Sequence, residues 1–160
     1  MFRFWYRFVL DNNSVIARGA TDLVYKRIEP HLSDYMGKVF EEICKQYLWK
    51  LLLSGKCPVE FSSLGRWWGN DPIEKRQTEI DIMGEQDKTT ALFCECKWTN
   101  EKVDLGIHET LIKRSKLFTY TDVHYYLFSK SGFTKGCIDK ANEMGNVILV
   151  SYENIVKLND

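Results

Sequence analysis

Two stretches of the chain, residues 78–83 and 90–98, alternate between apolar and polar side chains on either side of a polar turn at 85–88. A period of two is typical of β-strands with one apolar and one polar face. Because the connecting turn is short, we expect the two strands to pair antiparallel. The chain therefore has to form a fold that contains this β-hairpin.

The strongest helical pattern precedes the hairpin. Residues 34–53 carry apolar side chains three and four positions apart, beginning after Pro30. Ser33 or Asp34 can cap the first turn, because short polar side chains accept hydrogen bonds from free backbone N–H groups there. We therefore expect a helix at 34–53.

The remaining expected elements alternate between strand and helix. In chain order they are a short strand at 59–61 running into 64–69, then, after the hairpin, a helix at 104–119, a strand at 123–128, a helix at 134–144, a strand at 147–150 and a helical turn at 151–158. Two adjacent strands that are joined through a helix are typically parallel. The sequence thus predicts an α/β fold with a mixed β-sheet, an antiparallel hairpin plus parallel strands, flanked by helices on both faces.

Composition favours one compact domain in a chain of 160 residues that is 44% hydrophobic and 14% aromatic. We expect that domain at 34–160, preceded by an N-terminal lead-in segment at 1–33. Because the lead-in opens on dense aromatics, we expect it to be cut from a longer chain. Neither a membrane span nor a signal peptide is recognisable, which predicts a cytoplasmic protein with no membrane partner.

The net charge of zero excludes a uniformly basic nucleic-acid coat, but the charges are segregated along the chain. Residues 71–109 contain ten acids and five bases, whereas residues 110–140 contain six bases and two acids. Such runs are often merely solvated faces. They also suit a site that needs an acidic part for a metal and a basic part for phosphates.

The five cysteines show no spacing typical of a structural zinc site, and their number is odd. Cys94 and Cys96 face the same side of their expected strand. They could chelate a soft metal, but the interpretation we favour is a buried apolar face.

Acidic residues lie inside the hairpin among apolar neighbours. Alternation puts Glu95 and Lys97 on one face of the second strand, and Glu79 and Asp81 opposite Ile80 and Ile82 in the first. An unpaired buried carboxylate costs several kcal/mol of desolvation, so a cation must compensate it. That cation could be Lys97 or a divalent metal. Two carboxylates beside a lysine suit Mg²⁺ and hydrolysis of a phosphodiester by water.

This arrangement has a geometric condition. Asp81 and Glu95 project from the same face only if the numbers of paired residues add up to an even value. We therefore predict an odd-length loop or a β-bulge in the hairpin. The competing interpretation is that Glu79, Asp81, Glu95 and Lys97 are ordinary exposed charges.

The ordered motifs Glu79-Ile80-Asp81-Ile82 and Glu95-Cys96-Lys97, preceded by a helical Lys38-Val39-Phe40-Glu41, resemble the PD-(D/E)XK nuclease superfamily. More narrowly, five segments look like the uncharacterised C-terminal domain of archaeal and bacterial AAA-type ATPases. They are residues 2–9, 35–41, 65–69, 95–98 and 128–134. The resemblance departs from the superfamily at Thr78-Glu79-Ile80, which replaces a Pro-Asp pair.

The resemblance implies a restriction-endonuclease-like core with Mg²⁺ or Mn²⁺ as its cofactor. Asp81 and Glu95 would hold the metal, Glu41 would join them through a water, and Lys97 would act on the attacking water. Glu41 is preferred to Glu42 because it flanks the apolar stripe of its helix. An ATPase module would precede this domain.

Other residues could contact nucleic acid, although packing or solubility also explains them. These candidates are Arg66, Trp67, Lys113, Lys116 and Lys130. The predicted function is a metal-dependent nuclease that hydrolyses DNA, with RNA as an alternative substrate. A homodimer is left open. The alternative function is a catalytically inactive nuclease-fold domain that binds DNA or regulates the ATPase.

Overall fold

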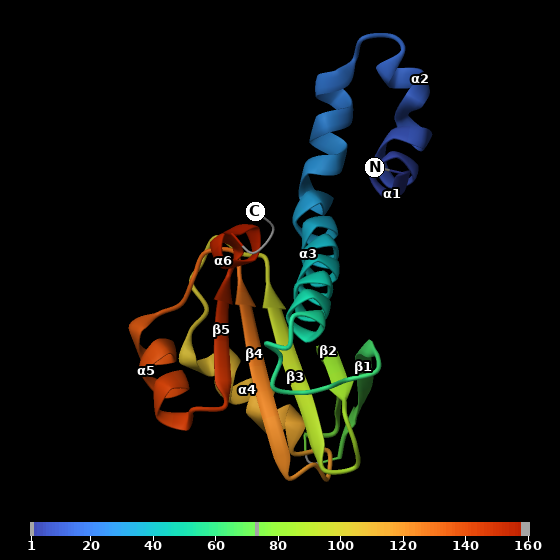
Figure 1. The fold of residues 1–160 in the computed structure, drawn as a ribbon. Helices are drawn as coiled ribbons and strands as arrows, with labels where there is room; N and C mark the ends of the chain where they lie inside the picture. The colour runs from blue at the N-terminus through green and yellow to red at the C-terminus, as the bar shows by residue number, and fades with distance from the viewer. Residues whose placement is uncertain (1, 73, 158–160) are drawn as a thin grey trace. The chain divides into compact units, whose positions relative to one another are not determined.

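The computed structural model describes residues 2–72 and 74–157. The chain separates into two compact units between Met36 and Gly37. The first unit contains short helical segments and the start of α3; their bounds are α1 Phe2–Phe4, the π-helical η1 Trp5–Val9, the 3-10 helix η2 Leu10–Asn12, α2 Asn13–Ile16 and α3 Thr21–Leu53. The second unit continues α3 and adds β1 Leu64–Asp71, β2 Arg76–Glu85, β3 Thr90–Lys97, α4 Leu105–Ser115, β4 Asp122–Ser129, α5 Lys135–Met144, β5 Val147–Ser151 and α6 Tyr152–Lys157 (Figure 1).

The predicted start of the helix at residue 34 is wrong, because α3 begins at Thr21 and continues through Pro30. Proline removes one backbone N–H from a helix interior, but its fixed φ is close to the helical value. Side chains are packed on both sides of the proline: Val24 is buried before it, and Tyr35 packs on Phe8 after it. The division at 1–33 and 34–160 stays a prediction.

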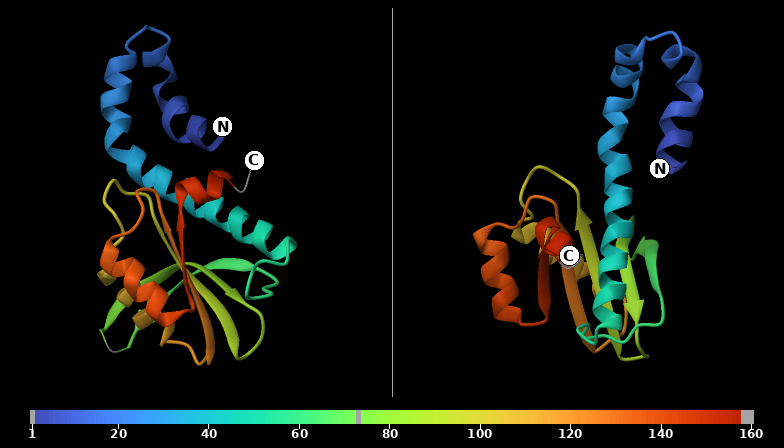
Figure 2. Two further views of the ribbon diagram at one scale, coloured as in Figure 1. Left: turned by 60° about the vertical axis from the view of Figure 1, so that its left-hand side comes forward. Right: turned by 45° about the horizontal axis from the view of Figure 1, so that its top comes forward.

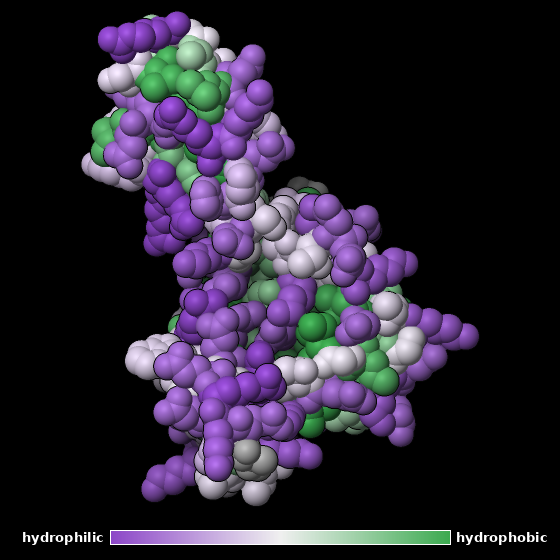
Figure 3. All heavy atoms as spheres, turned by 180° about the vertical axis from the view of Figure 1, so that it is seen from behind, coloured by the Kyte–Doolittle hydropathy of each residue, from purple (hydrophilic) through white to green (hydrophobic). Residues whose placement is uncertain are grey.

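The first unit is held together by aromatic contacts. The ring centroids of Phe4 and Phe8 lie 5.2 Å apart, and both rings pack on Tyr35 at 5.7 and 5.3 Å. Further large apolar side chains of this unit are exposed, among them Phe2 and Leu23, and hydrophobic atoms are visible on its surface in Figure 3. Within residues 2–72 and 74–157, no helix has both the length and the apolar character needed to cross a membrane.

The second unit is built on a five-stranded sheet in the order β1-β2-β3-β4-β5. The pairs β1–β2 and β2–β3 are antiparallel, whereas β3–β4 and β4–β5 are parallel. Figures 1 and 2 show the sheet with helices on both faces. The predicted mixed sheet flanked by helices is confirmed.

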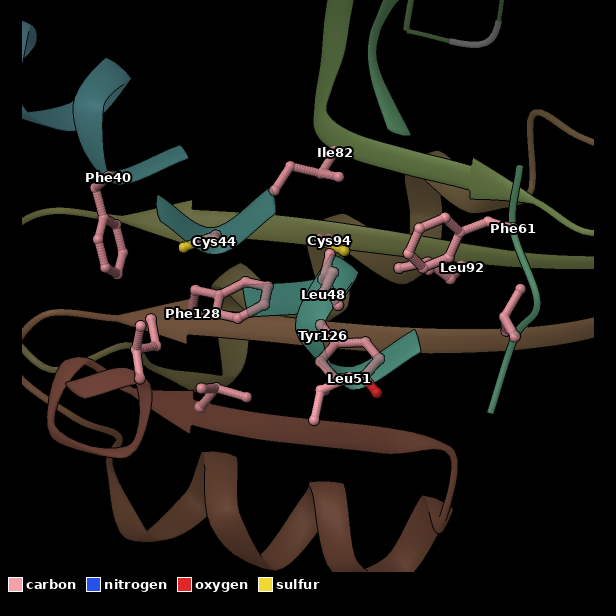
Figure 4. Close-up of a cluster of buried hydrophobic side chains, with 13 residues drawn as sticks. Phe40, Cys44, Leu48, Leu51, Phe61, Ile82, Leu92, Cys94, Tyr126 and Phe128 are labelled. Atoms are coloured by element: carbon pink, nitrogen blue, oxygen red, sulfur yellow. The ribbon is translucent and has the colours of Figure 1, made fainter. Parts of the chain in front are cut away.

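The two faces of the sheet bury separate apolar clusters. On one face, α3 and α6 pack against the sheet through side chains that include Leu48 and Ile155, and Figure 4 shows residues of α3 meeting those of β2, β3 and β4. On the other face, α4 and α5 contribute Leu111 and Ala141 to a cluster around Phe93.

Cys94 is completely buried on the α3 face, and Cys96 packs against the same cluster. The prediction that these two thiols belong to a buried apolar face is confirmed. Burial raises the pKa of the Cys94 thiol, because the interior disfavours a thiolate. The thiol therefore stays neutral and behaves as a small apolar side chain.

The predicted strand at 59–61 is wrong. Val59 and Phe61 are buried, but the first strand begins only at Leu64. Their apolar character reflects burial in the α3-side cluster rather than pairing in the sheet. Gly84 permits this approach, since a Cβ atom there would lie 2.8 Å from Leu64 Cδ2 and 3.1 Å from Phe61 Cβ.

Candidate carboxylate and cation site

The β2–β3 hairpin has the register that the sequence analysis required. Its pairs include Ile82 with Cys94 and Glu85 with Ala91, so paired numbers add up to an even value. The connection between the last pair, residues 86–90, has an odd length. The prediction of an odd-length loop or a bulge is confirmed.

The neighbouring β1–β2 pairing contains the irregularity. Gly65 pairs with Met83 and Trp67 pairs with Ile80, so Arg66 of β1 stands opposite two residues of β2. An extra residue of this kind interrupts the alternation of side chains. Those two residues are Asp81 and Ile82.

The predicted common face for Ile80 and Ile82 is therefore wrong. Ile82 belongs to the cluster under α3, whereas Ile80 belongs to the cluster under α4 and α5. Asp81 lies between them and is only 7% exposed. The bulge makes three consecutive residues of β2 buried, which strict alternation forbids.

The carboxylate of Asp81 takes the place of a backbone acceptor. The N–H of Cys96 donates to Asp81 Oδ2 at 2.8 Å, beyond the last β2–β3 pair at Ile82 and Cys94. The second oxygen, Oδ1, lies 3.6 Å from Arg66 Nη2. Asp81 therefore has an ordered position where the ladder between the two strands ends.

Glu41 approaches from α3 and meets the same arginine. Arg66 Nη2 donates to Glu41 Oε1 at 2.9 Å, and Arg66 Nη1 lies 3.8 Å from Glu79 Oε2. Burial, followed by the charge of Asp81, raises the pKa of Glu41. Glu42 instead pairs with Lys45 in a largely exposed position, as expected for the face of α3 that turns to water.

Glu95 lies between two cations. Lys97 Nζ donates to Glu95 Oε1 at 2.6 Å, and Arg114 Nη1 donates to Oε2 at 3.0 Å. Glu95 is only 5% exposed, and burial, followed by the charge of Asp81, raises its pKa. Burial lowers the pKa of Lys97, but the Glu95 carboxylate outweighs this effect and leaves it raised. Lys97 is therefore a protonated donor at neutral pH.

Arg114 is the functional candidate that the sequence analysis missed. It lies between Lys113 and Lys116, which were candidates, but was not itself among them. Its position in α4 carried a usable signal, because it follows the buried Leu111 by three residues and precedes the buried Ser115. Ser115 is fixed on the same side through a 2.7 Å hydrogen bond with the hydroxyl of Tyr125.

The structure thus brings Glu41, Asp81 and Arg66 together, and joins Glu95 to Lys97. The charge of Asp81 acts on both Glu41 and Glu95. All of these carboxylates offer oxygen ligands, which suit a hard divalent cation. Among the residues that the structure describes, however, no group of three or more His, Cys, Asp or Glu side chains is arranged to hold a metal ion. Arginine and lysine groups occupy the carboxylates instead.

The aromatic candidates differ in exposure. Trp67 packs on Phe118 with ring centroids 5.0 Å apart, whereas the neighbouring Trp68 is 76% exposed. A cavity of about 360 Å³ adjoins this region and is lined by Trp68, Gly69, Gln77, Thr78, Glu79 and Arg114. The cavity therefore borders Glu79, which lies near Arg66, and Arg114, which pairs with Glu95.

The basic candidates lie on different surfaces. Lys113 pairs with Glu74, and Lys116 is exposed on the same helix. Lys130 lies after β4, where it donates to Asn100 Oδ1 at 2.7 Å and stands 5.1 Å from the ring centroid of Trp98. Arg66, the remaining basic candidate, forms ion pairs with Glu41, Asp81 and Glu79.

The chain is similar to one curated protein and to two solved structures. It is 32% identical over 126 residues to the uncharacterized protein MJECL04 of Methanocaldococcus jannaschii; the aligned part is 77% of this chain and 27% of that protein. The chain thus spans about a quarter of that relative's length.

Two solved structures resemble the chain at 18% sequence identity each. The protein of unknown function AF1548 gives a TM-score of 0.45 over 73% of this chain and 66% of its own. The DNA modification-dependent restriction endonuclease AspBHI gives a TM-score of 0.40 over 88% of this chain and 34% of its own.

Residues 5–109 match one family model, and these residues include Glu41, Arg66 and the whole β2–β3 hairpin. The chain therefore belongs to the DUF234 family, which is described as archaeal and bacterial proteins of unknown function.

Proposed function

We propose that the second unit is a metal-dependent nuclease domain that hydrolyses DNA phosphodiester bonds. The observation that carries the proposal is the pair of buried carboxylates, Asp81 and Glu95, beside a protonated Lys97 at the end of the β2–β3 ladder. Buried charged groups that are not needed for packing are typical of functional sites. The resemblance to PD-(D/E)XK nucleases supports the same residues.

The chemistry of the donor set fits Mg²⁺ or Mn²⁺, with Asp81, Glu95 and Glu41 as the residues that would hold it. Their oxygen ligands are the type that these cations prefer. Burial, followed by the charge of Asp81, raises the pKa of Glu95, so additional positive charge would stabilise its ionised form. When bound, such a cation neutralises charge on a phosphoryl group and makes water more acidic.

The chain's own groups have distinct roles in this proposal. Glu95 holds the Lys97 ammonium in place through the 2.6 Å hydrogen bond. Lys97, as a cation, stabilises the negative charge that grows on the phosphate. Asp81 is positioned by the Cys96 N–H, and this bond ties the site to the end of the sheet. The cavity beside Glu79 and Arg114 is the proposed entrance for the backbone of the substrate.

A second function is favoured by one observation. Asp81, Glu95 and Glu41 each have a cationic side chain within ion-pair distance. A domain whose carboxylates are neutralised by its own arginine and lysine side chains can bind DNA or a protein without cutting DNA. Under this alternative the domain is an inactive nuclease fold that binds DNA or regulates an ATPase module.

We also propose an N-terminal ATPase module in the same protein. The resemblance to ATPase-associated domains supports this proposal, as does the fact that the aligned part is 27% of the M. jannaschii relative. We likewise propose that the substrate is DNA rather than RNA, that the protein forms a homodimer and that it is cytoplasmic.

The nuclease proposal is tested by incubating the protein with supercoiled and linear DNA in the presence of Mn²⁺. We expect cleavage by the wild type, and a loss of about 10²- to 10⁴-fold in Lys97→Met, since this is the range for removing a positioned catalytic group. Asp81→Asn should abolish cleavage while it retains an oxygen acceptor for the Cys96 N–H. Lys135→Met, at an exposed lysine of α5 that is not among the candidate nucleic-acid contacts, is the matched control.

Equal cleavage by all of these variants would contradict the assignment of the site. Absence of cleavage by the wild type, combined with tight DNA binding that Mn²⁺ does not change, would favour the inactive binding module.

A further inference from the structure

Arg66 makes contacts that a phosphate-binding arginine would not need. It stands on β1 opposite the bulge in β2, and its guanidinium reaches three carboxylates from two other elements. The distances are 2.9 Å to Glu41, 3.6 Å to Asp81 and 3.8 Å to Glu79. Its side chain is 36% exposed, so part of it faces solvent.

The oxygen atoms that Arg66 approaches belong to the proposed metal ligands. Asp81 Oδ2 already accepts from the Cys96 N–H, which leaves Oδ1 toward Arg66. Glu41 directs Oε1 to the same guanidinium nitrogen, Nη2. A divalent cation that binds these two oxygens must therefore replace Arg66. An arginine cannot give way by losing its proton, since it remains charged at any ordinary pH.

We propose that Arg66 is a built-in counter-cation of this site, and that a divalent metal binds Glu41 and Asp81 only by displacing its guanidinium. The inference rests on the proposed function, because it concerns the same carboxylates. The half-exposed position of Arg66 gives the displaced group a path to solvent, where it is available to a substrate phosphate. The arginine thereby weakens metal binding in the absence of substrate.

The size of the effect follows from the competition. A hydrogen bond to a charged group contributes more when it is shielded than when it is partly exposed. Loss of the competing arginine should therefore tighten metal binding by about tenfold, which corresponds to about 1.4 kcal/mol. Lysine, a point charge without the planar fork, should compete less well than arginine at the two carboxylates.

The test is calorimetric titration of the whole chain with Mn²⁺ alone, without DNA. We expect Arg66→Gln to lower the dissociation constant about tenfold, and Arg66→Lys to lower it by a smaller factor. Arg76→Gln is the matched control, because Arg76 is largely exposed and pairs with Glu74 at 4.0 Å, outside the proposed site. The control should stay within about twofold of the wild type. Circular dichroism establishes that each variant is folded, and Arg66→Lys keeps the test available if the glutamine variant unfolds.

The outcomes separate the inference from the nuclease proposal. Tighter Mn²⁺ binding by Arg66→Gln supports displacement, even if no variant cleaves DNA. Unchanged or weaker binding overturns it, and Mn²⁺-dependent cleavage in that case leaves the nuclease proposal standing. Absence of Mn²⁺ binding in the wild type and in both Arg66 variants overturns the displacement and the metal site together.

Discussion

The two halves of the β2–β3 hairpin differ in what they contribute. In the half near the turn, residues 82–85 and 91–94, the strands pair regularly and their apolar side chains enter the two cores. In the other half, residues 79–81 and 95–97, Asp81 replaces a backbone acceptor and charged groups gather. We call these the apolar half and the acidic half. The difference predicts that the first half stabilises the fold, whereas the second half holds the residues of the proposed function.

The largest expected effect on stability is in the apolar half. Phe93 is completely buried and contacts the rings of Phe118 and Tyr120 at 5.3 and 6.0 Å. Phe93→Ala should lower the free energy of unfolding by about 3 to 5 kcal/mol, because it leaves a cavity. Denaturant unfolding measures this loss. Phe2→Ala, at a residue that is 81% exposed, is the matched control, and equal losses in the two variants would break the comparison.

A smaller effect is expected in β1, at one glycine opposite the residue before the acidic half and one opposite the apolar half. Gly69 pairs with Thr78 in β2, and a Cβ atom there would lie 2.5 Å from Trp67 Cζ2. Gly65 pairs with Met83, and a Cβ atom there would meet nothing within 4 Å. Gly69→Ala should therefore destabilise by about 1 to 3 kcal/mol, the usual range for overpacking.

Gly65→Ala is the control for the same chemical change in the same strand. Its free energy of unfolding should stay within about 0.5 kcal/mol of the wild type, as is usual for substitutions that touch nothing. Melting temperature and fluorescence of the tryptophans follow both variants. A neutral Gly69→Ala would mean that Trp67 can leave Phe118 without cost.

The smallest effect concerns the pH dependence of stability. Burial, and then Asp81, raises the pKa of Glu95 above 4.5. The folded state thus keeps a proton that the unfolded chain has lost, so the free energy of unfolding falls as the pH rises from below 4.5 through the pKa of folded Glu95. Glu95→Gln should flatten this part of the profile. Urea unfolding from about pH 4 to about pH 7 measures the slope.

Gly65→Ala, in contrast, should keep the wild-type slope, because it changes no titrating group. Identical slopes in Glu95→Gln and the wild type would show that Glu95 does not differ from an exposed glutamate. The acidic half would then lose one of the features that set it apart.

Local patterns in the sequence predicted most of the fold. Alternation at 78–83 and 90–98 predicted the hairpin, and helical periodicity predicted the elements that became α4 and α5. These predictions succeed because strands and helices bury one face with a fixed period. The predicted start of α3 and the predicted strand at 59–61 were wrong. A proline occurs both before a helix and within one, and a short apolar run occurs both in strands and in buried loops, so the local sequence does not distinguish these cases.

The sequence by itself determined the element order of the second unit, the even register of the hairpin and the residue types available to a site. Only the tertiary structure decided the bulge at Asp81, the capture of Arg66 by Glu41 and the approach of Arg114 to Glu95. The physical reason is the distance along the chain between the interacting residues. Periodicity depends on neighbours a few residues apart, whereas these ion pairs join strands and helices that are 19 to 25 residues apart in the chain.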